Sequence, residues 1–201
     1  MRADPMLRFA TAKEWNAWLE RHHEVPDGLW LELAKKGAAF TTVTYAEALE
    51  VALCWGWIDG QKGAIDESTW KQRFTPRRAR SIWSKVNREK AEGLIRDGRM
   101  RPRGLAEVER AKGDGRWAAA YDSPKQATVP DDLKLALEAS KPARALFERL
   151  DATNRFAILH RVATAKQAAT RARRIVTFVA MLAKGDVPYP DRLPSTKKPR
   201  K

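Results

Sequence analysis

The sequence has one cysteine, Cys54, in 201 residues. A single thiol excludes an intramolecular disulfide, and it excludes a zinc site built from cysteines of one chain. Free cysteine is usually a small buried residue, so we expect a structural role for Cys54. No apolar run approaches the ~18 residues that a membrane-spanning helix needs, so we expect no membrane span.

Enzyme signatures are also missing. The sequence has no Gly-rich phosphate loop, no HExxH pair and no GxSxG turn. His22 and His23 lie together with no third ligand suggested, and His160 lies within a helical pattern. A histidine in such a setting is more often structural or solvated than catalytic. We therefore predict no catalytic residue, no cofactor and no metal site.

The first residues, MRADPMLRFATAKEW, lack the apolar stretch that a secretory signal carries. An amphipathic helical pattern begins almost at once, at Thr11. We therefore expect a cytoplasmic protein.

Positive charge is what the sequence has in excess. The net charge is +14, from 39 Lys and Arg against 25 Asp and Glu. Residues 1–70 are net acidic, whereas residues 71–103 carry 12 basic and 3 acidic side chains, and the tail 193–201 adds 4 basic residues. A concentrated positive field attracts phosphate-rich or acidic partners, although it does not identify them.

The hydrophobic pattern predicts an α+β fold in residues 1–112. Helices are expected at 11–23 and at 44–55, and a third helix is expected after the cationic loop that follows Pro76, ending at Gly98. A fourth helix is expected from Pro102 to about 112, and strands are expected at 29–36, 57–66 and 68–76. We expect these strands to form a small antiparallel sheet of about three strands packed by helices. Segment 113–129 is rich in Gly, Ala, Asp and Pro, and it is the expected connection.

An all-helical C-terminal module is predicted over residues 130–188, followed by a basic, disordered tail at 189–201. A threonine followed three residues later by Glu or Gln indicates a capping box, and this spacing occurs at Thr11, Thr44 and Thr164. Gly56 is placed to end the second helix in a left-handed conformation.

Five blocks of the sequence resemble one protein family: ALCWGWIDG, RFTPRRARSIWSKVN, GRM, AKGDGRW and AKQAATRARRI. In order and without large gaps over residues 7–188, they are similar to the YdeI/OmpD-associated family, the OmdA-like bacteriocin-protection proteins. The resemblance implies a context of stress or envelope resistance, with association to an outer-membrane porin and protection against bacteriocins or cationic peptides. It implies no catalytic residues.

The main candidate site is a set that we call the basic corner. If the strands pair antiparallel, its cations are expected to gather at one edge of the sheet, where Arg forks suit phosphate and a neighbouring aromatic ring can stack on a base. Trp83 is expected to be partly exposed, unlike the other seven tryptophans, which we assign to the core. The basic corner comprises Lys35, Lys36, Asp59, Lys62, Arg73, Arg77, Arg78, Arg80 and Trp83.

A secondary basic stripe is predicted on the last helix, formed by Lys166, Arg171 and Arg174. For both sets the simpler interpretation is a solvated surface with ordinary ion pairs, and for the stripe this interpretation is favoured.

The resulting hypothesis is a non-enzymatic protein that binds an anionic partner, nucleic acid or a phosphate-bearing ligand, through the basic corner. One alternative is a protein-interaction module that uses exposed Trp and Arg as an anchor. A second alternative is a small enzyme with a pocket around Asp59, where Lys62 or an arginine would complete the acid–base groups.

Overall fold

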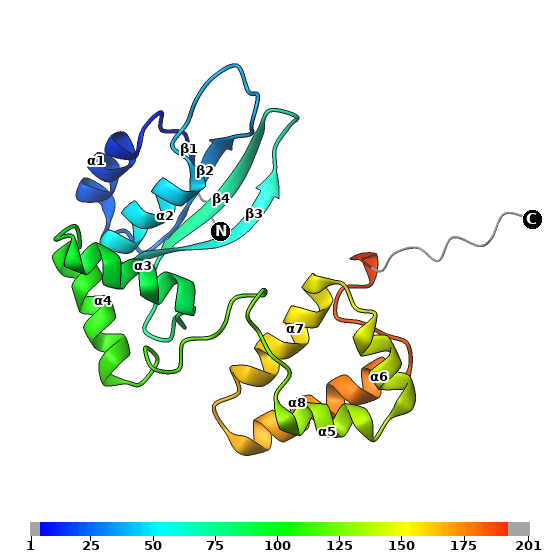
Figure 1. The fold of residues 1–201 in the computed structure, drawn as a ribbon. Coiled ribbons are helices and arrows are strands. Elements are labelled where there is room, and N and C mark those ends of the chain that lie inside the picture. The colour runs from blue at the N-terminus through cyan, green and yellow to red at the C-terminus, as the bar shows by residue number, and fades with distance from the viewer. Residues whose placement is uncertain (1–4, 193–201) are drawn as a thin grey trace, which may run out of the picture. The chain divides into compact units, whose positions relative to one another are not determined.

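The computed structural model describes residues 5–192 and divides the chain into two compact units, Met1–Ala120 and Tyr121–Lys201. The first unit combines a mixed four-stranded sheet with four helices, and the second is helical. The predicted α+β class with a helical C-terminal region is confirmed (Figure 1). No helix within residues 5–192 is long and apolar enough to cross a membrane.

Local capping fixes where the first two helices begin. In α1 (Ala12–His22), Thr11 Oγ1 accepts a hydrogen bond from the backbone N–H of Glu14. In α2 (Tyr45–Cys54), Thr44 and Glu47 form the complete reciprocal box. Gly56 follows α2 with a φ of 73°, a left-handed conformation that glycine adopts without a steric penalty.

The sheet has the order β1-β2-β4-β3 (Figure 1). The three predicted strands are β2 (Leu29–Ala34), β3 (Trp57–Ala64) and β4 (Thr69–Pro76), and all pairs among them are antiparallel. A fourth strand, β1 (Met6–Leu7), pairs parallel with β2 and makes the sheet mixed. Two residues are too short for a period-two pattern, which explains why the sequence did not predict this strand.

Alternation along the strands separates a buried face from a more open one. Leu29, Leu31 and Leu33 are buried with Gln72 and Phe74 of β4, on the side where α1 and α2 pack (Figure 1). Lys71 and Arg73 lie at the alternate positions of β4 and are partly exposed, as the pattern predicted. The core of this unit also contains Trp15 and Trp57.

A bulge interrupts the pairing of β3 with β4 between Asp59 and Lys62. The side chain of Gln72 is buried at this point, and its Nε2 donates to the carbonyl oxygens of Gly60 at 2.9 Å and Gln61 at 3.0 Å. A buried amide thus satisfies the carbonyls that the irregular ladder leaves open.

Two further helices complete the first unit, α3 (Lys85–Arg96) and α4 (Pro102–Gly113). Gly98, with a φ of 65°, follows α3, and Pro102 occupies the first turn of α4. Gly104 lets α4 approach the end of α2, because a Cβ at this position would lie 2.2 Å from the carbonyl oxygen of Cys54. This contact brings the loop between α3 and α4 next to the first two helices.

Between residues 121 and 192 the second unit contains four α-helices: α5 (Asp131–Glu138), α6 (Lys141–Glu148), α7 (Ala152–Ala163) and α8 (Ala168–Ala183). Their apolar stripes meet in one core that includes Leu133, Phe147, Ile158 and Leu182. A short 3-10 helix, η1 (Pro190–Arg192), follows. The part of the predicted disordered tail from residue 193 onward lies outside the described residues.

The capping box predicted for the last helix is wrong. Thr164 ends α7, and its hydroxyl donates to the carbonyl of His160 at 2.7 Å. Gln167 is the residue before α8, and it makes no side-chain capping bond. Thr164 and Gln167 lie at the two ends of the connection between α7 and α8. Their spacing is that of a capping box, but Thr164 does not precede the first turn of α8.

Candidate functional site

The structure does not bring the nine residues of the basic corner together. Lys35 and Lys36 follow β2 at the end of the sheet where the β3–β4 turn lies, and the backbone N–H of Lys35 donates to Ser68. Arg77, Arg78 and Arg80 follow the opposite end of β4. β4 contains eight residues, so its two ends lie about 23 Å apart at ~3.3 Å per residue. The antiparallel pairing of β2 with β4 therefore separates the two clusters of cations.

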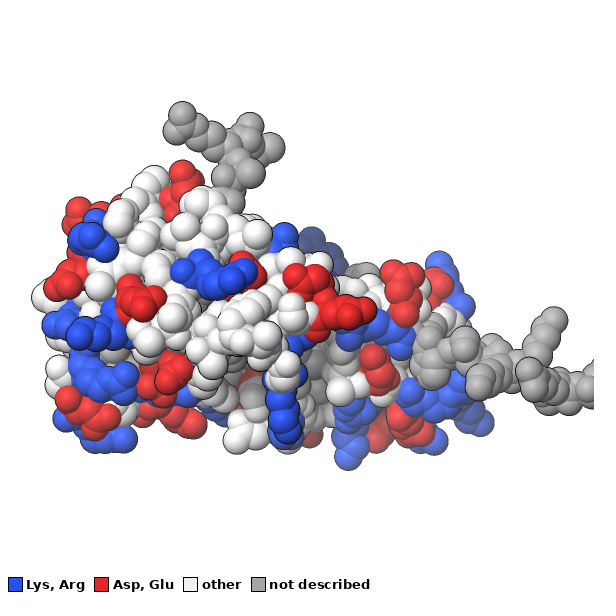
Figure 2. Space-filling model, turned by 90° about the horizontal axis from the view of Figure 1, so that it is seen from above, with Lys and Arg blue, Asp and Glu red and all other residues white. Residues whose placement is uncertain are grey.

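The other members lie between these ends. Asp59 pairs with Phe74 and accepts a hydrogen bond from the Tyr45 hydroxyl at 2.8 Å. Lys62 pairs with Gln72, and Arg73 lies next along β4. On the face of the first unit visible in Figure 2, Lys and Arg are interspersed with Asp and Glu. This face has no continuous surface of positive charge.

Trp83 is buried, contrary to the prediction of an exposed ring. Only 2% of its surface is accessible, and the guanidinium carbon of Arg77 lies 3.4 Å from the centre of its ring. The ring also packs edge-on against Trp117 at 4.8 Å. Because the loop after β4 folds back over the ring, Trp83 cannot be the anchor that the protein-interaction alternative requires.

Arg77 is buried as well, with 5% exposure. Its backbone N–H donates to Gly56, and its Nη1 donates to the carbonyl of Ile82. Arg77 therefore holds the loop against the sheet. Arg78 and Arg80 are exposed members of this cluster.

Two residues of the secondary basic stripe, Arg171 and Arg174, form hydrogen bonds to other elements of the second unit. Arg171 binds both carboxylate oxygens of Asp132 at 2.6 and 2.8 Å, and it also donates to the carbonyl of Val162. The hydrogen bond from Arg171 holds the pKa of Asp132 below its usual value. Arg174 donates to the carbonyl of Arg161, whereas Lys166 is exposed. The simpler interpretation of the stripe, ion pairs on a solvated face, fits these contacts.

A different group of cations meets at a pocket of about 430 Å³ in the first unit, which we call the cationic pocket. Three elements supply its walls: the start of α1, the last turn of α2 and the loop between α3 and α4. The lining residues are Ala12, Lys13, Asn16, Val51, Cys54, Gly98, Arg99 and Arg101.

Hydrogen bonds fix the walls of the cationic pocket. The indole Nε1 of Trp55 donates to Asn16 Oδ1 at 2.9 Å, which joins α1 to the end of α2. The backbone N–H of Arg101 donates to the carbonyl of Cys54 at 3.0 Å, and the Arg101 guanidinium lies 5.4 Å from the Trp55 ring. The CWGWIDG block is thus a helix-to-strand junction whose first residues also form one wall of the pocket.

The polar groups of the cationic pocket are mainly donors. Asn16 Oδ1 accepts from Trp55, and the amide nitrogen of Asn16 supplies a donor. Lys13 and Arg101 form no ion pair within residues 5–192. Arg99 binds Glu50 at 3.1 Å, and Glu50 is not among the lining residues. The lining of the pocket therefore includes two cations without an ion pair among the described residues, Lys13 and Arg101, a third cation, Arg99, that is paired with Glu50, and no carboxylate of its own.

Cys54 adds a buried thiol to this wall. Burial raises the pKa of the Cys54 thiol, although the nearby Arg99 and Arg101 act in the opposite direction. A protonated, 5% exposed thiol is a packing group rather than a reactive one. Within residues 5–192, no group of three or more His, Cys, Asp and Glu side chains could hold a metal ion.

Sequence reasoning missed Lys13, Asn16, Arg99 and Arg101. A partial signal was present, because Arg99 and Arg101 lie in the strongly basic segment 71–103. Lys13 and Asn16 belong to the acidic first part of the chain, more than 80 residues away. Their proximity depends on how α1, α2 and α4 pack.

Fold and pocket define a two-unit α+β protein with a donor-lined cavity in its first unit. Residues 7–107 match the model of a domain of unknown function, DUF8412, and residues 126–185 match the family described as bacteriocin-protection, YdeI or OmpD-associated. The chain therefore belongs to the DUF8412 family, and residues 126–185 of its second unit match the YdeI/OmpD-associated family model. The family resemblance seen in the sequence is confirmed. No curated protein or solved structure matched the chain.

Proposed function

We propose that the chain is a non-enzymatic binding protein that takes up a small phosphate-bearing ligand in the cationic pocket. The observation that carries this proposal is the lining of Lys13, Asn16, Arg99 and Arg101, which offers donors from α1 and from the loop between α3 and α4 and includes no carboxylate. Arginine forks match phosphate oxygens in pairs, and charge-assisted hydrogen bonds are stronger than neutral ones. The match of residues 126–185 to a family described as bacteriocin-protection supports a role of this binding in bacteriocin protection.

The arrangement supports a small ligand rather than a nucleic acid polymer. Proteins that bind single strands use a continuous basic groove with stacking aromatic rings along it. Here the cations of the basic corner are distributed along the whole of β4, and Trp83 is buried beneath Arg77. The cationic pocket is a discrete hollow of about 430 Å³, within the usual range of ~300–1,000 Å³ for small-molecule sites.

The test is a calorimetric titration of the full chain with inorganic pyrophosphate and with adenosine 5′-monophosphate. We expect the double variant Lys13→Ala/Arg101→Ala to weaken binding of both probes at least about tenfold, because a lost charge-assisted hydrogen bond costs about 1.5–3 kcal/mol. Both side chains are exposed, so the fold should be retained.

The matched control is Arg78→Ala/Arg80→Ala, which removes the same charge from exposed residues outside the pocket. We expect this variant to bind like the wild type. An equal loss in both double variants would indicate attraction by net charge alone and would contradict the proposal. A short single-stranded oligonucleotide that binds more tightly than either probe, with a steep salt dependence, would favour the nucleic acid hypothesis instead.

A further inference from the structure

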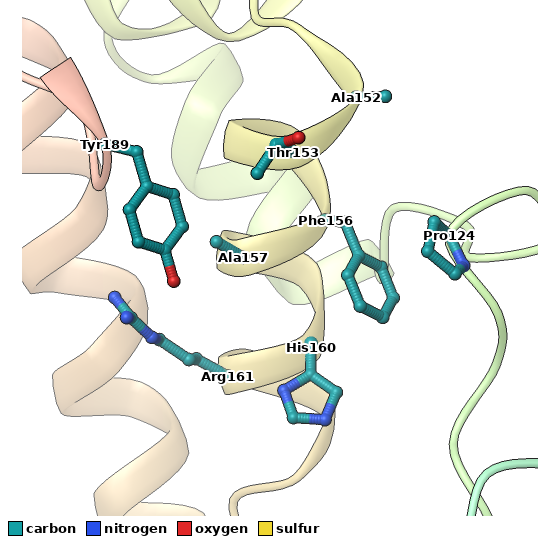
Figure 3. Close-up of a pocket in the computed structure, with 8 residues that line it drawn as sticks. All are labelled: Pro124, Ala152, Thr153, Phe156, Ala157, His160, Arg161 and Tyr189. Carbon is teal, nitrogen blue, oxygen red and sulfur yellow. The ribbon is translucent and has the colours of Figure 1, made fainter. Parts of the chain in front are cut away.

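A second hollow, of about 380 Å³, lies in the second unit along the exposed side of α7 (Figure 3). Residues spaced three and four apart on α7 form its floor, and residues from before α5 and after α8 form its sides. We call it the α7 groove, and it is lined by Pro124, Ala152, Thr153, Phe156, Ala157, His160, Arg161 and Tyr189.

One wall of the α7 groove is held in place by a buried amide. Asn154 has no exposed surface, and its Oδ1 accepts from the backbone N–H of Tyr189 at 2.8 Å while its Nδ2 donates to the carbonyl of the same residue at 3.2 Å. Val187, buried in the core, anchors the same segment. The backbone of Tyr189 is therefore held beside α7 before any ligand arrives, which lowers the entropic cost of binding.

The other wall is aromatic. His160 lies edge-on to Tyr121 with ring centres 4.5 Å apart, and Phe156 lies 5.4 Å from His160. Burial lowers the pKa of His160, and the nearby Arg161 and Arg174 act in the same direction, which favours the neutral imidazole. The floor and both walls thus present mainly apolar surface.

The charge in the α7 groove is positive. Within residues 5–192 the exposed guanidinium of Arg161 makes no ion pair, and none of the eight lining residues is acidic. In Figure 3 the Tyr189 hydroxyl points toward the Arg161 side chain, while Phe156 and Pro124 lie on the other side of α7. A second cation, Arg192, reaches Thr153 Oγ1 at 3.5 Å.

We propose that the α7 groove binds a small aromatic carboxylate. The ring of the ligand packs against Tyr189 and Ala157, and its carboxylate pairs with the guanidinium of Arg161. A flat apolar body with one negative end matches a groove that has apolar walls and a cation without a carboxylate partner. This site lies in the second unit and is independent of the cationic pocket.

The experiment is an NMR titration of the full chain with phenylacetate and with phenylacetamide, its neutral counterpart of the same shape. The assigned backbone amides of residues 121–192 and the ring signals of Tyr121 and Tyr189 report on this unit. We expect shifts at Ala157, Arg161 and Tyr189, and phenylacetate should bind about tenfold more tightly than phenylacetamide because of the charge-assisted pairing with Arg161.

Two variants separate the contributions. Tyr189→Ala should weaken both probes, whereas Arg161→Gln should weaken phenylacetate alone and bring the two probes to equal affinity. Arg173→Gln, an exposed arginine on α8 outside the groove, is the matched control and should leave both unchanged.

Three results would overturn the proposal: no binding of either probe at millimolar concentration, equal affinities in the wild type, or shifts that map to other residues. If Arg161→Gln still binds phenylacetate more tightly than phenylacetamide, the pairing of the ligand carboxylate with Arg161 is likewise wrong. Thermal unfolding of each variant checks that the unit remains folded.

Discussion

Two helical glycines of the first unit should respond to the same substitution in opposite directions. Gly104 in α4 packs against the end of α2, and an added Cβ would lie 2.2 and 2.8 Å from the carbonyl oxygen and carbon of Cys54 and 2.9 Å from the carbonyl oxygen of Leu53. These are backbone atoms, which cannot move as a flexible side chain does. Gly93 in α3 has only the end of the Arg96 side chain nearby, at 3.7 Å.

The expected magnitudes follow from these distances. Alanine stabilises a helix by about 0.5–1 kcal/mol relative to glycine, so Gly93→Ala should raise the free energy of unfolding by that amount. Overpacking of a well-packed contact costs about 1–3 kcal/mol. Gly104→Ala should therefore lower the free energy of unfolding by about 1–3 kcal/mol in spite of its better helix propensity.

Urea denaturation followed by tryptophan fluorescence measures both effects, because all eight tryptophans lie between residues 15 and 117 and report on the first unit. Gly104→Ala should also weaken pyrophosphate binding, since a displaced α4 moves Arg101 away from the carbonyl of Cys54. If Gly104→Ala is as stable as the wild type, the close approach of α4 to α2 is wrong. If Gly93→Ala is less stable than the wild type, the space for a Cβ at residue 93 is absent.

Two further predictions concern titrating groups. The pKa of Asp132 is lowered in the folded protein by its bond to Arg171, so its contribution to stability is present above the unfolded pKa and is lost as the pH falls through the folded pKa. Asp132→Asn should therefore cost about 0.5–1 kcal/mol at pH 7 and almost nothing near pH 2, as measured by urea denaturation at both pH values; a constant difference would contradict this account. Because burial raises the pKa of Cys54, its reaction with a disulfide reagent at pH 7.5 should be at least about tenfold slower in the native chain than in urea. Equal rates in the two states would show that Cys54 is accessible.

The burial of Arg77 changes how the basic corner should be tested. Substitution of Arg77 by Glu would place a carboxylate against Trp83 and remove the bond to Ile82, so loss of binding in such a variant would not separate a site from a folding defect. Arg78 and Arg80 are exposed and provide the cleaner comparison. Under our proposal the anion contacts lie in the cationic pocket rather than in this loop.

The sequence alone was sufficient for features that depend on neighbouring residues. The spacing of Thr44 and Glu47 predicted the start of α2, and the alternation of Gln72 and Phe74 with Lys71 and Arg73 predicted the two faces of β4. Capping and strand alternation act over two to four residues, so a local pattern contains the information needed to recognise them. The α+β class and the helical second unit followed from the same kind of signal.

Only the tertiary structure decided which charged residues meet. Strand direction placed Lys35 and Arg77 at opposite ends of the sheet, and the loop after β4 buried Trp83 beneath an arginine. Helix packing, permitted by Gly104, brought Lys13 to the same pocket as Arg101. Such contacts join residues far apart in the chain, and they depend on the packing of whole elements, which no short stretch of the sequence contains.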